Sequence, residues 1–553
     1  MLWTLWKGKS KETMNFKNNE SAQKLQGSYY TPAWIADFVA RWIGGYGARD
    51  ILEPSCGDGV FFQSFSDIVE NDISVIGFDT DSSAILQSKQ RRVTSKIHLT
   101  LRNEDFLNWA IKNYNAGCPI RFDAVVGNPP FIRYQYLEKE MQQSAQNLFS
   151  AMGQKFTKHT NAWLPFVLAS IAFLKPGGHI GMVIPAEIIN VLYAQGIRDY
   201  LISECDRILL VDPEDIWFED TLQGAMLLLA EKKTDKSNEA ELGIIRTVGK
   251  EFAMSDPTKF FNEAEYLPSS FFTGKWTYAL LTKKEAEAFN RVKESTSTYL
   301  FRHLADVDVG IVTGANKFFL VPDETVEQYG LADVAHPMFG RSEHCRGIIY
   351  DAEQHQQNAQ NGYPTNFIYF ESEENGRAHQ AYLAVGENEG IPSRYKCKIR
   401  TPWYRVPSVY SSRVNMLKRS SGMPRLILNE MEAYNTDTAY RITPKDGVHA
   451  ESLVYCFINS ITALSAELEG RFYGGGVLEL VPSEIERLLT VYVENEWDIQ
   501  KLNNDIKIMS KKDLLVQQDR AIFSLISDVR IEDVEMLHKA LVRLQARRQR
   551  LRC

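Results

Sequence analysis

The chain has 553 residues, of which 44% are hydrophobic and 24% are charged, and its formal net charge is −8 at pH 7. This length exceeds one compact domain, and the apolar content allows sizeable cores, so we expect two large units. The seven cysteines include no Cys-x-x-Cys pair, which argues against a zinc site or a disulfide framework. No apolar run is long enough for a signal peptide or a membrane span, so the sequence predicts a cytoplasmic protein without a membrane partner.

The predicted elements begin with a short strand that ends in a glycine turn, Ile51-Leu-Glu-Pro-Ser-Cys-Gly-Asp-Gly59, and an apolar helix start follows it. This arrangement is typical of a nucleotide-type cofactor site, because glycines let a ligand approach and a helix start offers N–H groups. The spacing is not Gly-x-Gly-x-x-Gly, and no Gly-Lys-Ser/Thr follows. Cradles for NAD and ATP phosphates are therefore disfavoured.

Two acidic residues follow the next elements of the chain. Asp79 comes directly after the apolar run 74–78, where a carboxylate can accept hydrogen bonds from ribose hydroxyls. Asp105 and Phe106 come next, where an adenine amino group and its ring could be held. Each acidic residue alone is more often a turn residue or a helix cap. Their order within one short region favours a cofactor site.

A rigid polar clamp follows the next buried strand, at Asn128-Pro-Pro-Phe131. The two prolines fix φ near about −65° and lack N–H donors, so this segment offers the Asn128 side-chain oxygen and the Pro129 carbonyl as acceptors. An exocyclic amine has two hydrogens to give them, and Phe131 adds an aromatic plate. A bare Asn-Pro-Pro tripeptide would more simply be a strand that ends in a proline turn.

From Gly27 to about Lys233, the ordered segments resemble the catalytic domain of the S-adenosylmethionine-dependent DNA adenine-N6 methyltransferases, in the gamma subgroup. The resemblance implies S-adenosylmethionine as cofactor, bound by the residues that match the family's cofactor segments: Tyr30, Thr31, Pro32, Glu53, Pro54, Ser55, Gly57, Asp79, Asp105, Phe106, Asn128 and Phe166. It implies catalysis by the tetrapeptide Asn128, Pro129, Pro130 and Phe131. Phe131 stands where many members have Tyr, and stacking needs only the ring face.

The resemblance also implies that the target adenine is flipped out of the duplex and stacks on Phe131 and Phe218. Trp217 is a competing candidate for this stacking, and a core position explains Trp217 equally well. Cys56 lies inside the cofactor loop rather than after a Pro-Cys turn. We therefore interpret it as a structural thiol and not as the nucleophile of a cytosine-C5 enzyme.

The predicted fold is α/β: a doubly wound Rossmann-like methyltransferase domain with a seven-stranded mixed sheet, then a mixed α+β target-recognition domain. The polar run 232–240 is interpreted as a loop or linker. The predicted boundaries are an N-terminal extension over 1–26, the catalytic domain over 27–240, the target-recognition domain over 241–500, and a helical segment with a basic tail over 501–553.

Three patches in the C-terminal half, 309–319, 424–430 and 457–476, resemble the recurring scaffold of target-recognition domains. Each alone could be a hairpin or a capping turn. A basic stretch with Trp403 and Tyr404 among its cations could contact phosphates, although a solvated loop explains it nearly as well. Its cations are Lys396, Lys398, Arg400 and Arg405. The Arg-rich C-terminus could extend DNA contact or simply end a helix.

The sequence therefore predicts a site-specific enzyme that methylates the N6 amino group of a flipped-out adenine in double-stranded DNA, for restriction-modification or phage defence. A cognate restriction endonuclease or a defence-complex subunit is a possible partner, and no metal is expected. Two alternatives stay open: an RNA or protein (glutamine) N-methyltransferase, and a catalytically silent DNA-binding subunit. The large C-terminal region disfavours the first alternative, and the filled catalytic positions disfavour the second.

Overall fold

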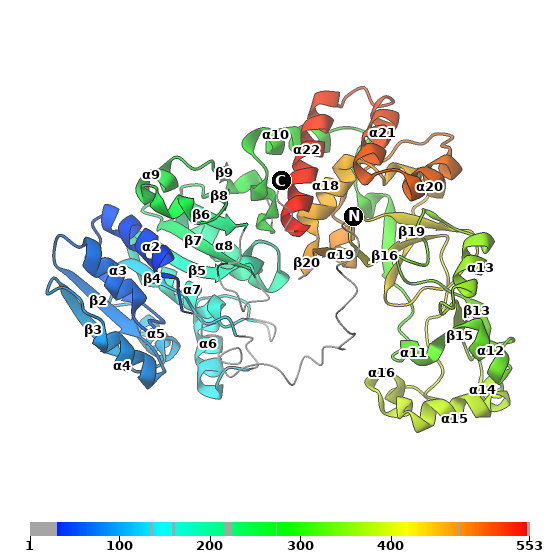
Figure 1. Ribbon diagram of the computed structural model, residues 1–553, viewed down its shortest axis with the longest axis horizontal. Coiled ribbons are helices and arrows are strands. Elements are labelled where there is room, and N and C mark those ends of the chain that lie inside the picture. The colour runs from blue at the N-terminus through cyan, green and yellow to red at the C-terminus, as the bar shows by residue number, and fades with distance from the viewer. Residues whose placement is uncertain are drawn as a thin grey trace, which may run out of the picture. The chain divides into compact units, whose positions relative to one another are not determined.

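The computed structural model describes residues 30–132, 136–156, 161–214, 217, 224–271, 274–473 and 476–549. The chain divides into two compact units, Met1–Leu280 and Leu281–Cys553, and each is described by itself (Figure 1). The predicted N-terminal extension over 1–26 lies outside the described residues, as does the tail from residue 550. Within the described ranges, no helix combines the length and the apolar character that crossing a membrane requires.

The first unit is built on one sheet, whose strands are β1 (Asp50–Glu53), β2 (Ile73–Phe78), β3 (Ile97–Arg102), β4 (Phe122–Gly127), β5 (Leu174–Pro185), β6 (Cys205–Pro213), β7 (Ala225–Lys232), β8 (Glu241–Thr247) and β9 (Leu267–Pro268). Their order across the sheet is β3-β2-β1-β4-β5-β7-β6-β8-β9. The strands from β3 to β5 are mutually parallel, whereas β7 runs antiparallel to both of its neighbours. The sheet is therefore mixed, as predicted.

The prediction of seven strands is wrong, because the described residues alone contribute nine strands to this sheet. β8 pairs with the outer edge of β6, and β9 pairs with β8. A strand edge carries unpaired N–H and C=O groups, and the next strand of the chain satisfies them. The unit consequently extends to Leu280 and does not end at residue 240, where the sequence had placed a domain boundary.

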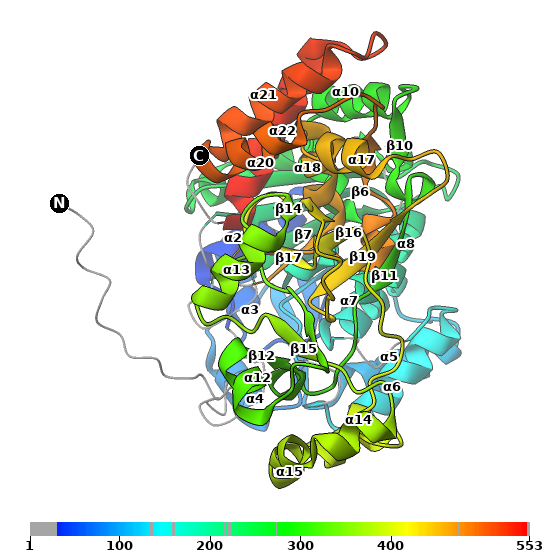
Figure 2. The same cartoon turned by 90° about the vertical axis from the view of Figure 1, so that its right-hand side faces the viewer.

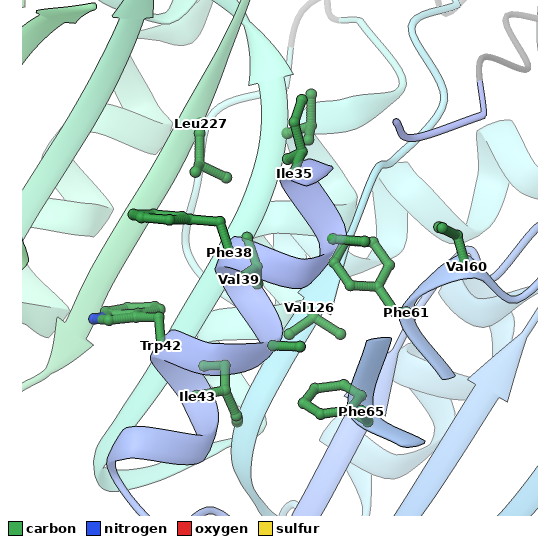
Figure 3. Close-up of a cluster of buried hydrophobic side chains, with 14 of the residues drawn as sticks. Ile35, Phe38, Val39, Trp42, Ile43, Val60, Phe61, Phe65, Val126 and Leu227 are labelled. Carbon is green, nitrogen blue, oxygen red and sulfur yellow. The ribbon is translucent and has the colours of Figure 1, made fainter. Parts of the chain in front are cut away.

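Helices cover both faces of this sheet, and they are α2 (Ala33–Gly45), α3 (Val60–Ile68), α4 (Ser82–Gln90), α5 (Phe106–Asn115), α6 (Lys139–Ala151), α7 (Trp163–Ala172), α8 (Gln195–Glu204) and α9 (Pro257–Asn262). On one face, α2 and α3 pack with Val75 of β2 and Val126 of β4 in one hydrophobic cluster (Figure 3). Side chains alternate along a strand, so Phe78 of β2 points to the opposite face. There it contacts Phe106 and Trp109 of α5.

The apolar pattern of α2 explains its place in the core. Ile35, Phe38, Val39, Trp42 and Ile43 recur every three or four residues and are fully buried (Figure 3). This spacing gives the helix one continuous apolar face. Removing one of the aromatic rings by substitution with Ala would cost about 3–5 kcal/mol of stability.

The second unit combines short strands and helices in an α+β arrangement. Its largest sheet has the order β11-β19-β16-β18-β14, with β11 (Ala305–Val309), β14 (Ile349–Tyr350), β16 (Val414–Leu417), β18 (Leu426–Asn429) and β19 (Ala439–Pro444). Smaller sheets pair β10 (Thr298–Leu300) with β22 (Leu489–Val491), β12 (Leu320–Val321) and β13 (Ala335–Pro337) with β15 (Asn366–Ile368), and β17 (Arg419–Ser420) and β20 (Arg471–Tyr473) with β21 (Val477–Glu479).

The helices of the second unit include α10 (Lys283–Lys293), α11 (Asn316–Phe319), α12 (Asp323–Tyr329), α13 (Ala352–Gln360), α14 (Glu373–Ala378), α15 (Gln380–Asn388), α16 (Tyr395–Lys398), α17 (Ala450–Cys456), α18 (Ser460–Glu469), α19 (Pro482–Ile485), α20 (Ile499–Ile508), α21 (Lys511–Phe523) and α22 (Ile531–Gln549). α21 and α22 contact α18, and α22 also contacts α10 (Figure 2). The C-terminal helices are thus an integral part of this unit.

Candidate functional site

The predicted cofactor residues lie where four strands end. β3, β2, β1 and β4 are neighbours and run parallel, so their carboxyl ends meet at one edge of the sheet. Glu53 ends β1, Asp79 follows β2, Asp105 follows β3 and Asn128 follows β4. β1 lies between β2 and β4, where the strand order reverses, and ligands bind at such a switch point in open α/β sheets.

The turn after β1 is fixed by hydrogen bonds from distant segments. Gly57 has φ of +50°, a left-handed conformation that favours glycine. Its N–H donates to Asp79 Oδ2 at 2.8 Å, and its carbonyl accepts from Ser88 Oγ at 2.7 Å. The Arg91 guanidinium pairs with Asp58 in the same turn. Ser88 and Arg91 come from α4 and the residue that ends it, and no motif in the sequence had indicated them.

Three carboxylates, those of Glu53, Asp58 and Asp79, interact at this edge. In the described part of the chain, one oxygen of Glu53, Oε2, has no hydrogen-bond partner, and this side chain is 1% exposed. Burial, and then the charges of Asp58 and Asp79, raise the pKa of Glu53 well above its usual range. Burial also raises the pKa of Asp79, although backbone N–H groups of Asp81 and Gly57 counter it. A ligand with positive charge and hydroxyl donors would relieve both the repulsion and the missing hydrogen bond.

The segment Tyr30-Thr-Pro32 lies beside the glycine turn. The Tyr30 ring lies 3.6 Å from where a Cβ on Gly57 would be, and this side chain is half exposed. Burial, followed by the charges of nearby aspartates, raises the pKa of Tyr30. Thr31 is buried, and the Pro32 carbonyl accepts the first amide hydrogen bonds of α2. The structure therefore brings this segment to the turn, and its contact with the cofactor stays a prediction.

Asp105 and Phe106 begin α5. Asp105 Oδ1 accepts the N–H of Leu107 at 2.9 Å and so caps the helix. Phe106 is buried, and its ring centroid lies 5.6 Å from that of Phe166 on α7. The structure thus shows the helix-cap and core roles of these residues directly. It also brings together the two aromatic residues that we expect to border the cofactor adenine, and that contact stays a prediction.

The tetrapeptide that starts at Asn128 is joined to the cofactor turn. Ser55 Oγ donates to the Asn128 backbone carbonyl at 3.0 Å, and Pro54 Cδ lies 3.5 Å from where a Cβ on Gly127 would be. Pro129 is buried and Pro130 half-buried, whereas Phe131 is partly buried against the hydrophobic cluster of α2 and α3. A residue partly packed in this way keeps part of its ring accessible while its position is fixed.

The second stacking candidate, Phe218, lies outside the described residues, so its role stays a prediction. Its competitor Trp217 is partly buried, with ring centroids 5.5 Å from Trp34 and 6.0 Å from Phe252. These contacts support the core interpretation of Trp217.

Cys56 is buried at the base of the cofactor turn. Burial raises the pKa of its thiol, which therefore stays protonated at neutral pH and is a poor nucleophile. The six cysteines in the described ranges are all buried and unbridged. Over those same ranges, no three His, Cys, Asp or Glu side chains are grouped as metal ligands.

The three patches of the predicted recognition scaffold all lie in the second unit. Residues 309–319 run from the end of β11 through a turn to α11, and residues 424–430 contain β18. Residues 457–476 begin where Asn459 Oδ1 accepts the N–H of Thr462 at 2.8 Å and caps α18, and they continue into β20. Residues 474–475 lie outside the described ranges. Hairpin and cap roles are thus present, and reading of DNA by these patches stays a prediction.

Comparison with known proteins matches each unit to a family model from restriction-modification methyltransferases. Residues 63–217 match the model of the Eco57I restriction-modification methylase, and residues 273–523 match the C-terminal domain of the Type II methyltransferase M.Eco57I. The chain is 22% identical over 524 residues to the Type II methyltransferase M.AccI of Acinetobacter calcoaceticus, covering 89% of this chain and 93% of that protein. It is 27% identical over 365 residues to M.BanIII of Aneurinibacillus aneurinilyticus, covering 55% and 60%.

A solved structure shares the fold of nearly the whole chain. The Type IIL restriction-modification enzyme MmeI, determined in complex with DNA, matches with a TM-score of 0.50 and 10% identity, over 97% of this chain and 77% of that one. That likeness concerns the fold, whereas the two family models and the relatives indicate the class, that of the methyltransferases. More particularly, the chain is a relative of the restriction-modification DNA methyltransferases, which confirms the predicted resemblance at that level. The gamma subgroup stays a prediction.

The relationship implies S-adenosylmethionine as the cofactor, and the residues at the sheet edge fit it. This molecule carries a sulfonium and an ammonium charge, two ribose hydroxyls and an adenine ring. The carboxylates of Glu53 and Asp79 suit the charges and hydroxyls. Glu53 Oε2, which has no hydrogen-bond partner among the described residues, is an acceptor for such a ligand. The rings of Phe106 and Phe166 suit the adenine.

Proposed function

We propose that the chain is a site-specific DNA methyltransferase that modifies the N6 amino group of an adenine flipped out of duplex DNA. The observation that carries this proposal is the hydrogen bond from Ser55 Oγ to the Asn128 carbonyl, 3.0 Å long. It joins the cofactor turn to the tetrapeptide that offers two acceptors and an aromatic ring. Methyl donor and amino acceptor would thereby meet at the carboxyl edge of the sheet.

Bound S-adenosylmethionine would supply an electrophilic methyl group at this edge. Glu53, Ser55, Gly57 and the Tyr30-Thr-Pro32 segment would hold its methionine part, and Asp79 its ribose. Asp105, Phe106 and Phe166 would hold its adenine. The two Asp79 oxygens already accept the N–H groups of Gly57 and Asp81, and each keeps a further lone pair for a hydroxyl.

Asn128 and Pro129 would activate the target amine. Its nitrogen is a poor nucleophile because the lone pair is delocalised into the purine ring. Two hydrogen bonds, to Asn128 Oδ1 and to the Pro129 carbonyl, would favour a tetrahedral nitrogen with its lone pair directed at the methyl carbon. As the N–C bond forms and the S–C bond breaks, the same oxygens stabilise the positive charge on nitrogen. The methylated nitrogen then loses a proton to water, so no strong base is needed.

Base flipping is part of this proposal, because a base stacked inside a duplex cannot bring its amino group to a catalytic pocket. Extrusion costs a few kcal/mol, and stacking on an aromatic side chain returns roughly 1–3 kcal/mol per base. We assign this stacking to Phe131 and Phe218. Phe131 is already fixed by its contact with the cluster of α2 and α3, so little conformational freedom is lost on binding.

Double-stranded DNA is the proposed substrate, and the second unit is proposed to recognise the target sequence. The DNA-bound MmeI structure, which shares this fold, supports that assignment. A restriction endonuclease or a defence-complex subunit in the cytoplasm is the proposed functional partner, since the relatives are Type II methyltransferases.

The test is methyl transfer from labelled S-adenosylmethionine to unmodified genomic DNA, followed by digestion to nucleosides and mass spectrometry. Label is expected in N6-methyladenine. Asn128→Ala should reduce its rate by about 10²–10³-fold, as loss of one group that stabilises the transition state does. Asn147→Ala, on the exposed side of α6, is the matched control and should keep wild-type activity.

Other outcomes select the alternatives. In parallel reactions with RNA and with protein as substrates, label in RNA or in protein glutamine, and none in DNA, would replace the DNA assignment. An unlabelled DNA sample from a protein that still binds the cofactor would indicate the silent DNA-binding subunit.

A further inference from the structure

A run of forty or so residues in the second unit has an unusual charge. Between Gly390 and Asn429 there are nine Lys or Arg and no Asp or Glu, although the whole chain has a net charge of −8. A positive local surface is what attracts phosphates, whatever the total charge of the protein. The contacts of each cation decide whether this run forms such a surface.

Five of the nine cations are committed to the fold. Arg413 pairs with Glu451, and Lys418 and Arg419 pair with Glu479. Arg425 donates to the Cys345 carbonyl, and Arg400 donates to the carbonyls of Val312 and Thr313. The other four are exposed and form no ion pair among the described residues: Arg394, Lys396, Lys398 and Arg405. Their charges are therefore available to a partner.

These four cations lie on and around α16, which the neighbouring turn holds in place. Arg400 Nη1 and Nη2 donate to Thr313 and Val312 at 2.8 and 2.6 Å. A Cβ on Gly314 would lie 2.6 Å from Lys396 Cβ, so the turn approaches the helix as closely as glycine permits. α16 is therefore a rigid platform, although it is only four residues long.

Two large apolar side chains stand among the cations. Tyr395 is 76% exposed and Ile399 is 66% exposed, and they are four residues apart, so both leave the same side of one helical turn. The aromatics that the sequence had offered for this role are in the core instead. Trp403 packs on Phe318 at 5.3 Å between ring centroids, and Tyr404 is buried.

We propose that the surface formed by Arg394, Tyr395, Lys396, Lys398, Ile399 and Arg405 contacts the duplex that is methylated. The four cations bind phosphates, while Tyr395 and Ile399 pack against sugars or base edges. This combination fits DNA, because phosphate contacts fix register and apolar contacts add to them at the groove. Exposed carboxylates also stand on α14 and α15, but in the described part of the chain none of them lies within ion-pair distance of these four cations, and Glu373 pairs with Arg377 of its own helix. The inference rests on the proposed function and assigns its DNA contact.

The test compares two double variants of the full chain, K396Q/K398Q and K511Q/K512Q. The second pair lies in the first turn of α21 and is equally exposed. Affinity for a duplex fragment of unmodified genomic DNA is measured over a range of salt concentrations. Each phosphate contact contributes about 0.9 to the slope of log affinity against log salt, so K396Q/K398Q should lower the slope by about 1.8. The control should keep the wild-type slope, and both variants should keep the wild-type melting temperature and S-adenosylhomocysteine affinity.

Tyr395→Ala tests the apolar contact separately. It should weaken duplex binding about 5-fold or more with an unchanged salt slope, since the lost contact is uncharged. Two results would overturn the inference: a salt slope in K396Q/K398Q equal to that of the wild type, or a salt slope that becomes equally shallow in both double variants. Wild-type methyl transfer to the same duplex is measured in parallel. Transfer without a change of slope refutes only this surface, whereas a slope change without any transfer refutes the proposed function and leaves the DNA contact standing.

Discussion

Glu53 in the first unit and Glu467 in the second are both buried glutamates, at 1% and 7% exposure, yet their surroundings differ. Glu53 Oε2 has no hydrogen-bond partner within the described residues, and like charges surround it. The Glu467 carboxylate instead accepts two hydrogen bonds of 2.8 Å from the Arg548 guanidinium. An incomplete buried carboxylate costs stability and suits a group that a ligand completes. A buried carboxylate whose oxygens are hydrogen-bonded can instead join two helices, as Glu467 joins α18 to α22.

The largest expected effect comes from breaking the completed pair. Glu467→Ala leaves the Arg548 charge buried without its carboxylate, which typically costs about 3–5 kcal/mol. Urea unfolding, followed by hydrogen exchange in α22, should show this loss, while affinity for S-adenosylhomocysteine stays at the wild-type value. The exposed Glu532→Ala in the first turn of α22 is the control. A Glu467→Ala protein as stable as the control would refute the structural role of the pair.

Asp519 is a third buried carboxylate, and its contribution to stability is expected to depend on pH. It accepts hydrogen bonds from Ser460 N and Oγ, and burial, despite those bonds, raises its pKa to about 6. Because the folded pKa exceeds the unfolded value of about 3.9, the stabilising contribution is present below pH 4 and is lost as pH rises to 6. Between these pH values the free energy of unfolding falls by about 3 kcal/mol, because each unit of difference between the folded and unfolded pKa corresponds to about 1.36 kcal/mol.

Asp519→Asn should remove that loss, so its stability relative to wild type should increase from pH 4 to pH 6 and stay level above. Hydrogen exchange of α21 amides at each pH measures the difference. Burial lowers the pKa of the neighbouring His538, whose contribution to stability changes with pH in the opposite direction. Because His538 Nδ1 lies 3.9 Å from Asp519 Oδ2, the same comparison is repeated in a His538→Gln background. A difference that does not vary with pH would contradict the assignment.

Glu53→Gln is expected to separate stability from binding. It removes a buried carboxyl whose ionised form is disfavoured by burial and by the charges of Asp58 and Asp79, so the ligand-free protein should be as stable as wild type or more so. A hydrogen bond to a charged group contributes about 1.5–3 kcal/mol, so cofactor affinity should fall by roughly 10- to 150-fold. Calorimetry with S-adenosylmethionine measures it. Wild-type affinity in this variant would show that the incomplete carboxylate does not face the ligand.

Ser55→Ala should have the smallest effect. It removes the hydrogen bond to the Asn128 carbonyl, a neutral interaction of about 1 kcal/mol. The methyl-transfer rate constant at saturating cofactor should fall about 5-fold, because the bond positions the catalytic segment. Single-turnover kinetics measure the rate, and Ser55→Thr, which keeps the hydroxyl, should restore most of it. Equal losses in both variants would assign the effect to packing.

The order of motifs along the chain predicted that Glu53, Asp79, Asp105 and Asn128 belong to one site. The structure brings them to one edge of the sheet, because parallel strands bring their carboxyl ends together. The order of motifs did not predict β8, whose sequence Glu241–Thr247 is an ordinary short apolar run after a polar one. Nor did linear spacing separate core aromatics such as Trp217 and Trp403 from exposed Tyr395. That distinction depends on contacts between residues far apart in sequence.

The contacts of buried arginines could not be predicted from the sequence either. The Arg-rich C-terminus was consistent with DNA contact or with a helix end, and the structure assigns Arg548 to a buried pair with Glu467. No motif in the sequence indicated a role for Arg198. It is fully buried, and its guanidinium donates to the carbonyls of Ile188, Val191 and Gly274, which fixes the segment that follows β5. Such side chain to carbonyl bonds leave no repeated pattern in a sequence.

The outer strands β8 and β9 have a practical consequence for dissecting this protein. A fragment cut at residue 240 would lack the strand that covers β6, and its bare edge would be free to pair with other molecules. Such a fragment is expected to aggregate on expression, even though it retains every motif of the candidate site. A fragment that ends at Leu280 keeps the edge covered and is the one suited to isolated study of methyl-donor binding.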